Sequence, residues 1–460
     1  MSSQAVEIRV IERCQVSPPP GTTVAESILP LTFLDLLWLN AGVVEQVFFY
    51  SLPHSTSYFV DSILPNLKSS LSVALQQFYP LAGKIRRSPD RDDGYELHYV
   101  DGDAVAFTVA EHGGGGGGGD DFDDLSGSHA RNVKRVVPLI PQLPRPDGDG
   151  GKRLLALQVT VFPNRGVSLG VIVHHAACDG SSAMQFMSWW AAACARAGGL
   201  AVAAPPPPVL DRSLVKDPQD LYSLYYKGIG VGGEATETMA KKAAALDTGH
   251  TAIGTFTLGA EHITRLKEMV SSRAKVRCST IVVTFAFAWV CLVKARAIDS
   301  DELSHLIFAA DCREKLRAPL PASYFGNCIS GCLVDLTAGE LTGEDGVAAA
   351  ARVIGKAIEE LKKKGDPFED AAHWPEKFKN MVSQQPLSVA GSPKLKVYDM
   401  DFGWGRPKKV EIPSIRYTGA MSVAESREEE GGVEIGFVLP KHEMEEFEKH
   451  FTGGLIKLLH

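Results

Sequence analysis

Four consecutive prolines, within residues 201–208 (AVAAPPPP), divide the chain near its midpoint. Proline fixes φ and lacks an amide donor, so this stretch can be neither the interior of a helix nor a central strand. The chain has 460 residues, well above the roughly 100–200 residues of one ordinary domain. We therefore expect two domains, residues 1–197 and 251–460, joined by an extended crossover over residues 198–250.

The charge balance restricts the partners of the chain. Lys and Arg number 47 and Asp and Glu 55, which gives a formal net charge of −8. Proteins that hold nucleic acid through its phosphates need a basic face, so we expect no nucleic-acid partner. An anionic small molecule is still admissible, because a local group of Lys and Arg can lie within an acidic protein.

Nothing in the sequence indicates membrane insertion or secretion. The apolar stretch 278–293 is shorter than the ~20 residues that span a bilayer, which predicts a buried core helix or strand. Glu7, Arg9 and Glu12 occupy positions where a secretory signal needs an apolar core. Eight cysteines are scattered without a CxxC pair, as in a reducing compartment. We expect a cytoplasmic protein that makes no membrane contact.

A predicted β-hairpin leads to the residues best suited to chemistry. Two apolar runs, residues 154–162 and 167–174, flank the turn sequence PNRG. The second run continues into HHAACDG, after which Ser181 and Ser182 would cap a helix that ends near residue 197. A strand end followed by a sharp turn into a helix can hold a side chain exposed in a cleft.

His175 is the candidate base at this turn, because imidazole takes and returns a proton near neutral pH. A hydrogen-bonded structural histidine is the alternative, and the local pattern does not separate the two. A zinc site made of His174, His175, Cys178 and Asp179 lacks a distant ligand cluster, so we expect no metal. A serine nucleophile is not indicated either, since no GxSxG sequence occurs.

Two glycine-rich stretches match the sequence pattern of phosphate-binding loops, but their surroundings argue against that function. Seven glycines at residues 113–119 precede a group of aspartates that would repel phosphate, so we expect a disordered surface insertion. The GxGxxG match at residues 228–233 follows a poor strand, which favours a flexible loop over a dinucleotide site.

Together, several motifs resemble the plant BAHD acyl-CoA-dependent acyltransferase family over essentially the whole chain. HxxxDG is formed by His175, Asp179 and Gly180, and a complete DFGWG lies far downstream at residues 401–405. The sequence YFGNC at residues 324–328 is similar to the clade that acylates anthocyanin, flavonoid and other phenolic glucosides, in which malonyltransferases are prominent.

The resemblance implies an α/β fold of two chloramphenicol-acetyltransferase-like domains with the active-site channel at their interface. HxxxD would lie in the first domain, and YFGNC and DFGWG in the second. His175 would act as general base on an acceptor hydroxyl, whose attack on the thioester would release CoA without a covalent acyl-enzyme.

The resemblance also implies roles for further residues. Asp179 would be structural and paired with Arg313, and Asp401 and Gly403 would shape a tight loop. Trp404 could donate its indole N–H to the oxyanion, with core packing as the alternative. Trp38 resembles an aromatic residue on the acceptor side, with a core tryptophan as the alternative. The residues implied in CoA binding are Lys267, Ser279, Thr280, Cys328 and Ser392.

We therefore expect a monomeric enzyme without a permanently bound cofactor. It would move a malonyl group from malonyl-CoA to a sugar hydroxyl of a phenolic, flavonoid or anthocyanin glucoside. A hydroxycinnamoyl-CoA donor is an alternative, because YFGNC does not separate aliphatic from aromatic donors. A different class of function, a catalytically silent relative that binds CoA or a partner protein, disagrees with the intact His175 and DFGWG.

Overall fold

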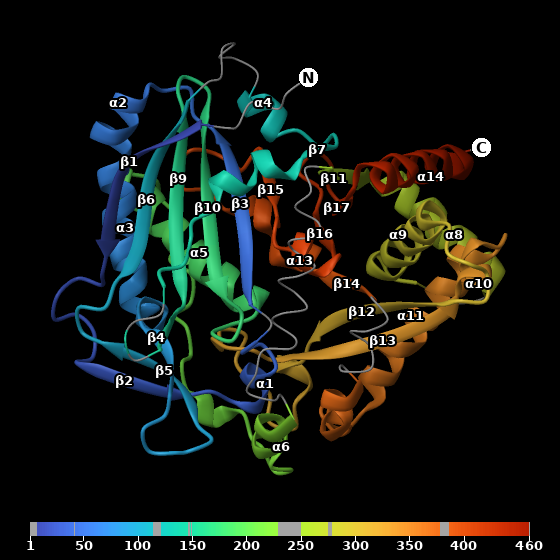
Figure 1. Ribbon diagram of the computed structural model, residues 1–460, viewed down its shortest axis with the longest axis horizontal. Helices are drawn as coiled ribbons and strands as arrows, with labels where there is room; N and C mark the ends of the chain where they lie inside the picture. The colour runs from blue at the N-terminus through green and yellow to red at the C-terminus, as the bar shows by residue number, and fades with distance from the viewer. Residues whose placement is uncertain are drawn as a thin grey trace.

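A computed structural model describes the chain over residues 7–40, 42–113, 121–145, 148, 150–228, 250–274, 278–377 and 386–459. Within these ranges the chain forms three β-sheets with helices packed on them (Figure 1). Residues 114–120 of the glycine run and residues 229–233 of the GxGxxG match lie outside the described residues. The described part of the predicted disordered insertion is ordered, which corrects that prediction. Gly113 ends the strand β6 (Val105–Gly113), and the aspartates after the run lie in the helix α4 (Asp121–Leu125), which is held by its buried Phe122 and Leu125.

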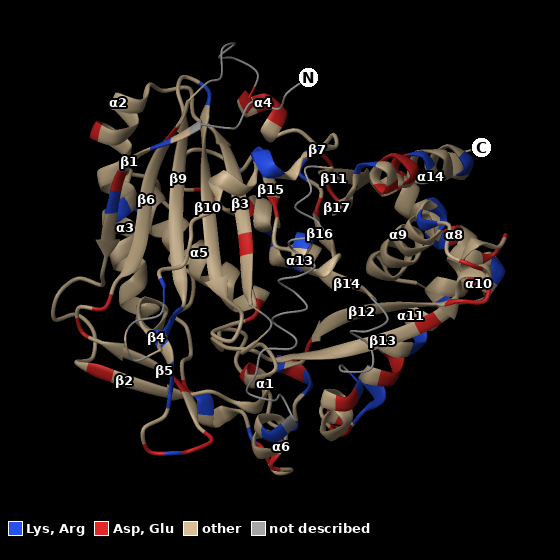
Figure 2. Cartoon of the chain, viewed as in Figure 1, with Lys and Arg blue, Asp and Glu red and all other residues tan. Residues whose placement is uncertain are grey.

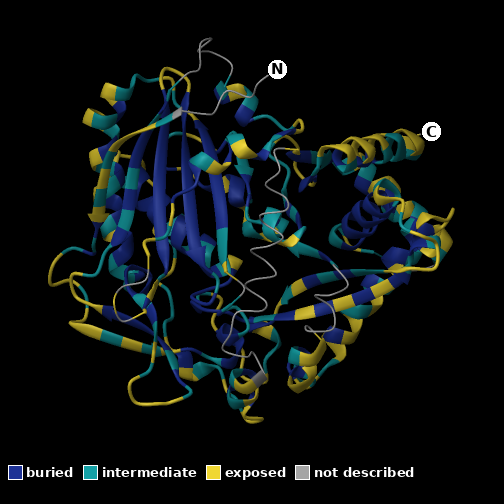
Figure 3. Ribbon diagram, in the orientation of Figure 1, coloured by how far each residue is buried: buried dark blue, intermediate teal, exposed yellow. Residues whose placement is uncertain are grey.

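The first sheet has six strands and holds the predicted hairpin. β9 (Leu155–Phe162) and β10 (Gly166–His174) pair antiparallel in its centre, which confirms the hairpin. Every residue of both strands is buried, and neither strand carries a charge (Figures 2 and 3). The strand order is β1 (Glu7–Val16), β6 (Val105–Gly113), β9, β10, β3 (Val43–Ser51) and β15 (Lys409–Glu411).

Both faces of this sheet are covered, which explains why its central strands lack the alternation of a half-exposed strand. Helices α3 (Leu64–Gln77) and α5 (Gly180–Ala197) pack against each other on one face (Figure 1). On the other face, α4 (Asp121–Leu125) contributes Phe122 and Leu125 to a separate apolar cluster.

The second sheet has seven strands and is covered by four helices, α8 (Ala260–Ala274), α9 (Thr280–Arg296), α11 (Gly346–Lys363) and α14 (Lys441–Leu459). Helix α9 is buried along most of its length, which confirms the prediction of a core element there. None of the helices in the described ranges is long and apolar enough to cross a membrane. The strand order is β13 (Ile329–Thr337), β12 (Leu303–Asp311), β14 (Leu387–Ala390), β16 (Met421–Glu425), β17 (Val433–Pro440), β11 (Thr251–Leu258) and β7 (Arg131–Asn132).

Each half of the chain lends a strand to the sheet of the other half. β15 comes from the second half and pairs with β3, whereas β7 comes from the first half and pairs with β11. The described part of residues 198–250, predicted as extended, also contains a helix, α6 (Leu221–Gly228). A third sheet of four strands completes the first half, with the order β2 (Glu26–Pro30), β5 (Tyr95–Val100), β4 (Lys84–Arg87) and β8 (Lys152–Arg153).

Candidate functional site

His175 follows directly on the last residue of β10, at the predicted strand end. Its main-chain N–H donates to the carbonyl of Gly42 at 3.3 Å. The indole of Trp38 stacks on its imidazole, with ring centroids 3.8 Å apart and planes 13° apart. The side chain of His175 is half-buried, and no described residue accepts or donates a hydrogen bond at its Nδ1.

Burial lowers the pKa of His175. The carbonyl of residue 175 itself, the charge of Asp179 and the side chain of Asn327 raise this pKa, but to a smaller extent. Because the pKa lies below the ordinary histidine value, the imidazole is neutral at physiological pH and can accept a proton. The neighbouring His174 is buried more deeply, and burial lowers its pKa to about 3.

The carboxylate of Asp179 is buried and fully engaged in structural contacts. Its Oδ1 accepts a hydrogen bond from the N–H of Ser182 at 3.0 Å, so Asp179 is the N-cap of α5. Its Oδ2 lies 2.9 Å from Nη2 of Arg313 and accepts from the N–H of Cys328 at 3.1 Å. The predicted Asp179–Arg313 ion pair is therefore present.

The predicted helix cap was wrong. Ser181 and Ser182 lie inside α5, which begins at Gly180. The hydroxyl of Ser182 contacts the main-chain carbonyls of Tyr324 and Gly326 instead. The carboxylate of Asp179 thus serves at once as helix cap and as the anion of an ion pair.

A second buried ion pair braces the same turn from another direction. Nη1 of Arg212 lies 3.1 Å from both carboxylate oxygens of Asp35, in helix α1 (Phe33–Leu36). Nη2 of Arg212 donates to the carbonyl of Ala177, within the HxxxD turn, at 2.9 Å. Gly326 leaves room for this arginine, because a Cβ there would meet Nη1 at 2.2 Å.

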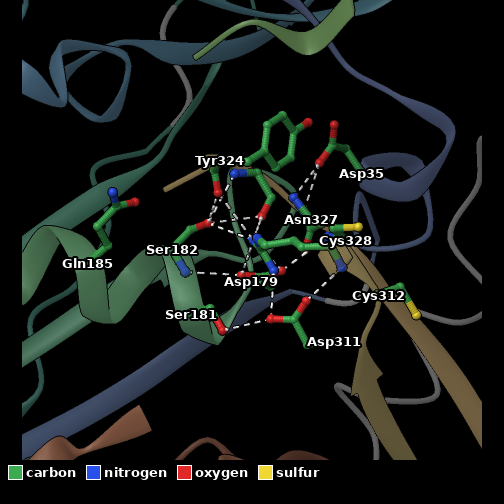
Figure 4. Close-up of polar contacts among 12 residues, drawn as sticks. Asp35, Asp179, Ser181, Ser182, Gln185, Asp311, Cys312, Tyr324, Asn327 and Cys328 are labelled. Carbon is green, nitrogen blue, oxygen red and sulfur yellow. Dashed lines mark hydrogen bonds and ion pairs between the residues drawn. The ribbon is translucent and has the colours of Figure 1, made fainter. Parts of the chain in front are cut away.

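Asn327 connects these two groups of residues. Its side-chain Nδ2 donates to Oδ1 of Asp35 at 2.8 Å and to the main-chain carbonyl of His175 at 3.0 Å. Figure 4 shows Asp35 and Asn327 at one side of the polar cluster, Asp311 at the other and Asp179 between them. The YFGNC segment is thereby joined to the turn that carries His175.

Three of the residues implied in CoA binding gather at the beginning of α9. Nζ of Lys267, on α8, donates to the hydroxyl of Thr280 at 2.9 Å. Ser279 is the N-cap of α9 and accepts from the N–H of Val282 at 3.4 Å. A helix N-terminus with a lysine beside it suits a phosphate group.

The other two residues implied in CoA binding lie elsewhere. Cys328 is buried beside Asp179, and burial raises the pKa of its thiol. Ser392 precedes the turn 393–395, and Leu395 in that turn would lie 3.2 Å from a Cβ placed on Gly180. A side chain at position 180 would have to displace the end of Leu395 by a few tenths of an ångström.

The DFGWG segment forms a tight loop, as predicted. Oδ1 of Asp401 accepts from the N–H of Gly403 at 2.7 Å and from that of Gly405 at 2.9 Å. Both glycines have positive φ, +92° and +87°, a conformation that other residues rarely adopt. The indole of Trp404 packs against Phe402, Tyr50 and Phe59, with ring centroids 5.3, 5.4 and 6.4 Å away.

Trp404 does not lie at His175. Its contact Tyr50 is seven residues along β3 from Val43, the partner of His174, a span of about 23 Å in a strand. A Cβ on Gly403 would approach Ala195, fifteen residues along α5 from Gly180, a span of about 22 Å in a helix. The structure therefore corrects the idea of Trp404 as an oxyanion donor and favours the alternative, packing.

Comparison with known proteins decides the family. Residues 6–453 match the model of the family described as "Transferase family". The chain is 35% identical to the malonyl-coenzyme A:anthocyanin 3-O-glucoside-6''-O-malonyltransferase of Dahlia pinnata, over 97% of both chains. It is 37% identical to phenolic glucoside malonyltransferase 1 of Arabidopsis thaliana, over 95% of this chain and 96% of that protein. The chain belongs to the BAHD family of acyl-CoA-dependent acyltransferases.

Solved structures confirm the fold class of this BAHD acyltransferase. Vinorine synthase matches with a TM-score of 0.67 and 20% identity, over 96% of both chains. F. graminearum TRI101, complexed with coenzyme A and T-2 mycotoxin, matches with a TM-score of 0.66 and 15% identity, over 93% of this chain and 98% of that chain. The predicted α/β architecture of two chloramphenicol-acetyltransferase-like domains agrees with both.

Two residues of this BAHD site escaped the sequence analysis, Asp35 and Arg212. Asp35 carried a signal, because a carboxylate inside the apolar run FLDLLW must find a cation when that run is buried. Arg212 carried none, since it lies in a proline-rich stretch and pairs with a residue 177 positions away.

Proposed function

We propose that this acyltransferase moves a malonyl group from malonyl-CoA to a sugar hydroxyl of a phenolic, flavonoid or anthocyanin glucoside. Malonyltransferases of anthocyanin and phenolic glucosides are among its relatives at 35–37% identity. The observation that carries the chemistry is His175, a neutral, half-exposed imidazole on a turn that two buried ion pairs hold in place.

The reaction is a direct transfer. Nε2 of His175 accepts the proton of the acceptor hydroxyl, and the oxygen attacks the thioester carbonyl to form a tetrahedral oxyanion. Collapse of the oxyanion breaks the C–S bond and expels the CoA thiolate, a good leaving group because thiols ionise near a pKa of about 8.5. The protonated imidazole then returns its proton to the sulfur.

A covalent acyl-enzyme is unnecessary in this mechanism. The thiols next to the HxxxD turn are Cys178 and Cys328, both buried. Burial raises the pKa of each, which keeps them protonated and poorly nucleophilic. The acceptor hydroxyl, activated by His175, is therefore the nucleophile.

Other residues bind and orient the reactants. Lys267, Ser279 and Thr280 would hold CoA phosphate at the start of α9, and Asp179 would position the HxxxD turn without contacting substrate. Trp38 covers one face of the His175 ring, which supports a place for it beside the acceptor hydroxyl. The domain boundaries, the monomeric state and the cytoplasmic location stay predictions.

A hydroxycinnamoyl donor is the second candidate. The coumaroyl-CoA:anthocyanidin 3-O-glucoside-6''-O-coumaroyltransferase 2 of Arabidopsis thaliana is 36% identical over 99% of both chains. This likeness equals that of the malonyltransferases, so the choice of donor rests on the assay.

Thiol release from malonyl-CoA and from p-coumaroyl-CoA, each with a panel of flavonoid and phenol glucosides, tests the proposal. We expect malonyl-dependent release and a product heavier by one malonyl group. Release with p-coumaroyl-CoA alone, or equal rates with both, would overturn the malonyl assignment and keep the mechanism. Release with neither donor would contradict the proposed function, and calorimetric binding of CoA to such an inactive protein would agree with a catalytically silent relative.

A further inference from the structure

The two-stranded ribbon of β12 and β13 has one buried face and one outer face (Figure 3). Residues directly opposite one another in an antiparallel pair point to the same face, and the faces alternate along each strand. On the buried face, Leu306, Phe308 and Val334 pack with helices α9 and α11 in one apolar cluster. The outer face consists of five cross-strand pairs, none with a buried member: Leu303–Thr337, His305–Asp335, Ile307–Leu333, Ala309–Gly331 and Asp311–Ile329.

The outer face begins at the HxxxD turn. Oδ2 of Asp311, in the innermost pair, accepts a hydrogen bond from the hydroxyl of Ser181 at 3.4 Å. The same oxygen lies 3.1 Å from Nη1 of Arg313, whose Nη2 pairs with Asp179 (Figure 4). A molecule that reacts at His175 therefore has this face within reach.

The pairs next to Asp311 suit a flat apolar group. Ala309 and Gly331 carry almost no side chain, so a ring can approach the strand backbone between them. The next pair outward, Ile307 and Leu333, is apolar, and Leu333 is 39% exposed. Successive pairs on one face are two residues apart, about 7 Å along the strand. One ring covers the first pair, and only a longer ring system reaches the second.

The acyl donor approaches from the other side of this sheet in our proposal. Helix α9 lies against the buried face, where Nε1 of Trp289 donates to the hydroxyl of Ser304 at 2.8 Å. Four residues earlier in α9, the ring of Phe285 lies 5.5 Å from that of Phe308. Helix α9 thus runs antiparallel to β12, and its first residues, proposed to hold CoA phosphate, lie toward the inner end of the buried face. The outer face is left for the acceptor.

The charges of the outer face also favour the acceptor over the donor. The side chain of Asp311 is 49% exposed and shares Arg313 with Asp179, so its charge is only partly balanced. A second carboxylate, Asp335, lies further out opposite His305. These carboxylates repel the anionic groups of malonyl-CoA and admit an uncharged or cationic aromatic group.

We propose that the outer face of the β12–β13 ribbon binds the aromatic aglycone of the acceptor glucoside. The sugar lies at His175, the first ring lies on Ala309 and Gly331, and the further rings of a flavonoid reach Ile307 and Leu333. The preferred acceptor is therefore a multi-ring glucoside without negative charge. This inference rests on the proposed function, because it places the sugar hydroxyl at His175.

The variant Leu333→Asp tests the second apolar pair. Leucine is partly exposed there, so its replacement leaves the core intact. We expect the KM for quercetin glucoside to rise roughly tenfold, because a carboxylate replaces an apolar contact with the distant rings. The KM values for phenyl glucoside, whose single ring stops at the first pair, and for acyl-CoA should stay within about twofold. Steady-state kinetics with each acceptor at saturating donor measure these values.

Leu303→Asp is the matched control. Leu303 is on the same face, is 55% exposed and receives the same substitution. It lies four residues further out along β12 than Ile307, about 13 Å beyond the pair that the aglycone reaches. We expect the KM for quercetin glucoside to stay at the wild-type value.

The possible results separate this inference from the proposed function. An unchanged KM for quercetin glucoside in Leu333→Asp would overturn the inference. So would an equal rise for phenyl glucoside or acyl-CoA, or an equal effect of Leu303→Asp. If the wild-type enzyme transferred neither acyl group, the proposed function would fail, and calorimetric titration with quercetin glucoside would still test the face. Binding weakened by Leu333→Asp alone would support the inference, and equal binding by all three proteins would overturn it.

Discussion

The HxxxD turn and the DFGWG loop are both complete family motifs, yet the structure gives them opposite surroundings. The turn is held by the buried pairs Asp179–Arg313 and Asp35–Arg212 and presents a half-exposed imidazole. In the DFGWG loop, Asp401 is exposed and its carboxylate accepts hydrogen bonds from the amides of Gly403 and Gly405, while the tryptophan joins an aromatic cluster. The two lie about 22 Å apart along α5.

The DFGWG loop fastens the second half of the chain to the first sheet. Just before the loop, the carbonyl of Met400 accepts a hydrogen bond from the hydroxyl of Tyr50, on β3, at 2.8 Å. Just after it, β15 pairs with the same strand. A complete motif therefore identifies the family, but the surroundings of its residues show whether a residue has a catalytic or a structural role.

The largest effect is expected at the HxxxD turn. His175→Ala should lower kcat by about 10²- to 10⁴-fold, the usual contribution of a general base. Its melting temperature should change little, because the ring is half-buried and its Nδ1 has no hydrogen-bond partner among the described residues. Near-normal turnover in steady-state assays would show that His175 is not the base.

Asp179→Asn should mainly destabilise the fold. It leaves the buried guanidinium of Arg313 without its best anion, which costs about 3–5 kcal/mol of unfolding free energy in comparable buried pairs. Asp311→Asn is the matched control, because Asp311 contacts the same arginine at 3.1 Å with a side chain that is 49% exposed. Its cost should be about 0–1 kcal/mol.

Urea denaturation of the two variants measures the difference. Equal destabilisation would contradict the distinction between the buried and the exposed partner. A stably folded but inactive Asp179→Asn enzyme would assign a chemical role to this carboxylate and remove it from the supporting network.

His174 should make the fold sensitive to acid. Its pKa is about 3 in the folded protein and about 6.5 when unfolded, so between these values only the unfolded chain binds the proton. The unfolding free energy should therefore fall as the pH decreases from 6.5 toward 3, by about 1.4 kcal/mol per pH unit from this residue.

The variant His174→Asn isolates that contribution. Its Oδ1 can replace Nδ1 of the ring, which accepts a hydrogen bond from the N–H of Ala176 at 3.3 Å. Stability measured by denaturation at several pH values should depend less on pH in the variant than in the wild type. An identical dependence would show that His174 binds its proton over the same pH range in the folded protein as in the unfolded chain.

The smallest effect on catalysis is expected at the DFGWG loop. Trp404→Phe should keep kcat within about threefold, because the ring packs far from His175 and phenylalanine retains an aromatic contact. A loss of about 10²- to 10³-fold in kcat, as when an oxyanion donor is removed, would contradict this account.

The sequence predicts what short-range patterns specify. The hairpin before His175 followed from two apolar runs around PNRG, and the buried helix α9 from its uncharged stretch. The family resemblance supplied the Asp179–Arg313 pair, whose members lie 134 positions apart. It also supplied the DFGWG loop, where the aspartate accepts hydrogen bonds from the loop amides and the two glycines adopt positive φ.

The exchange of strands and the second ion pair could not be predicted in this way. β15 has three residues and β7 two, too few to show a period, and their pairing joins distant parts of the chain. Asn327 meets Asp35 across 292 positions, so its hydrogen bonds exist only in the folded protein.

The pH dependence of kcat/KM tests the central claim, that neutral His175 is the base. Because burial lowers its pKa, activity should be lost only as the pH falls below the ordinary histidine value of 6.5, with one acid limb and a plateau above it. A profile that rises through pH 8 and beyond, with no limb in the histidine range, would contradict the account.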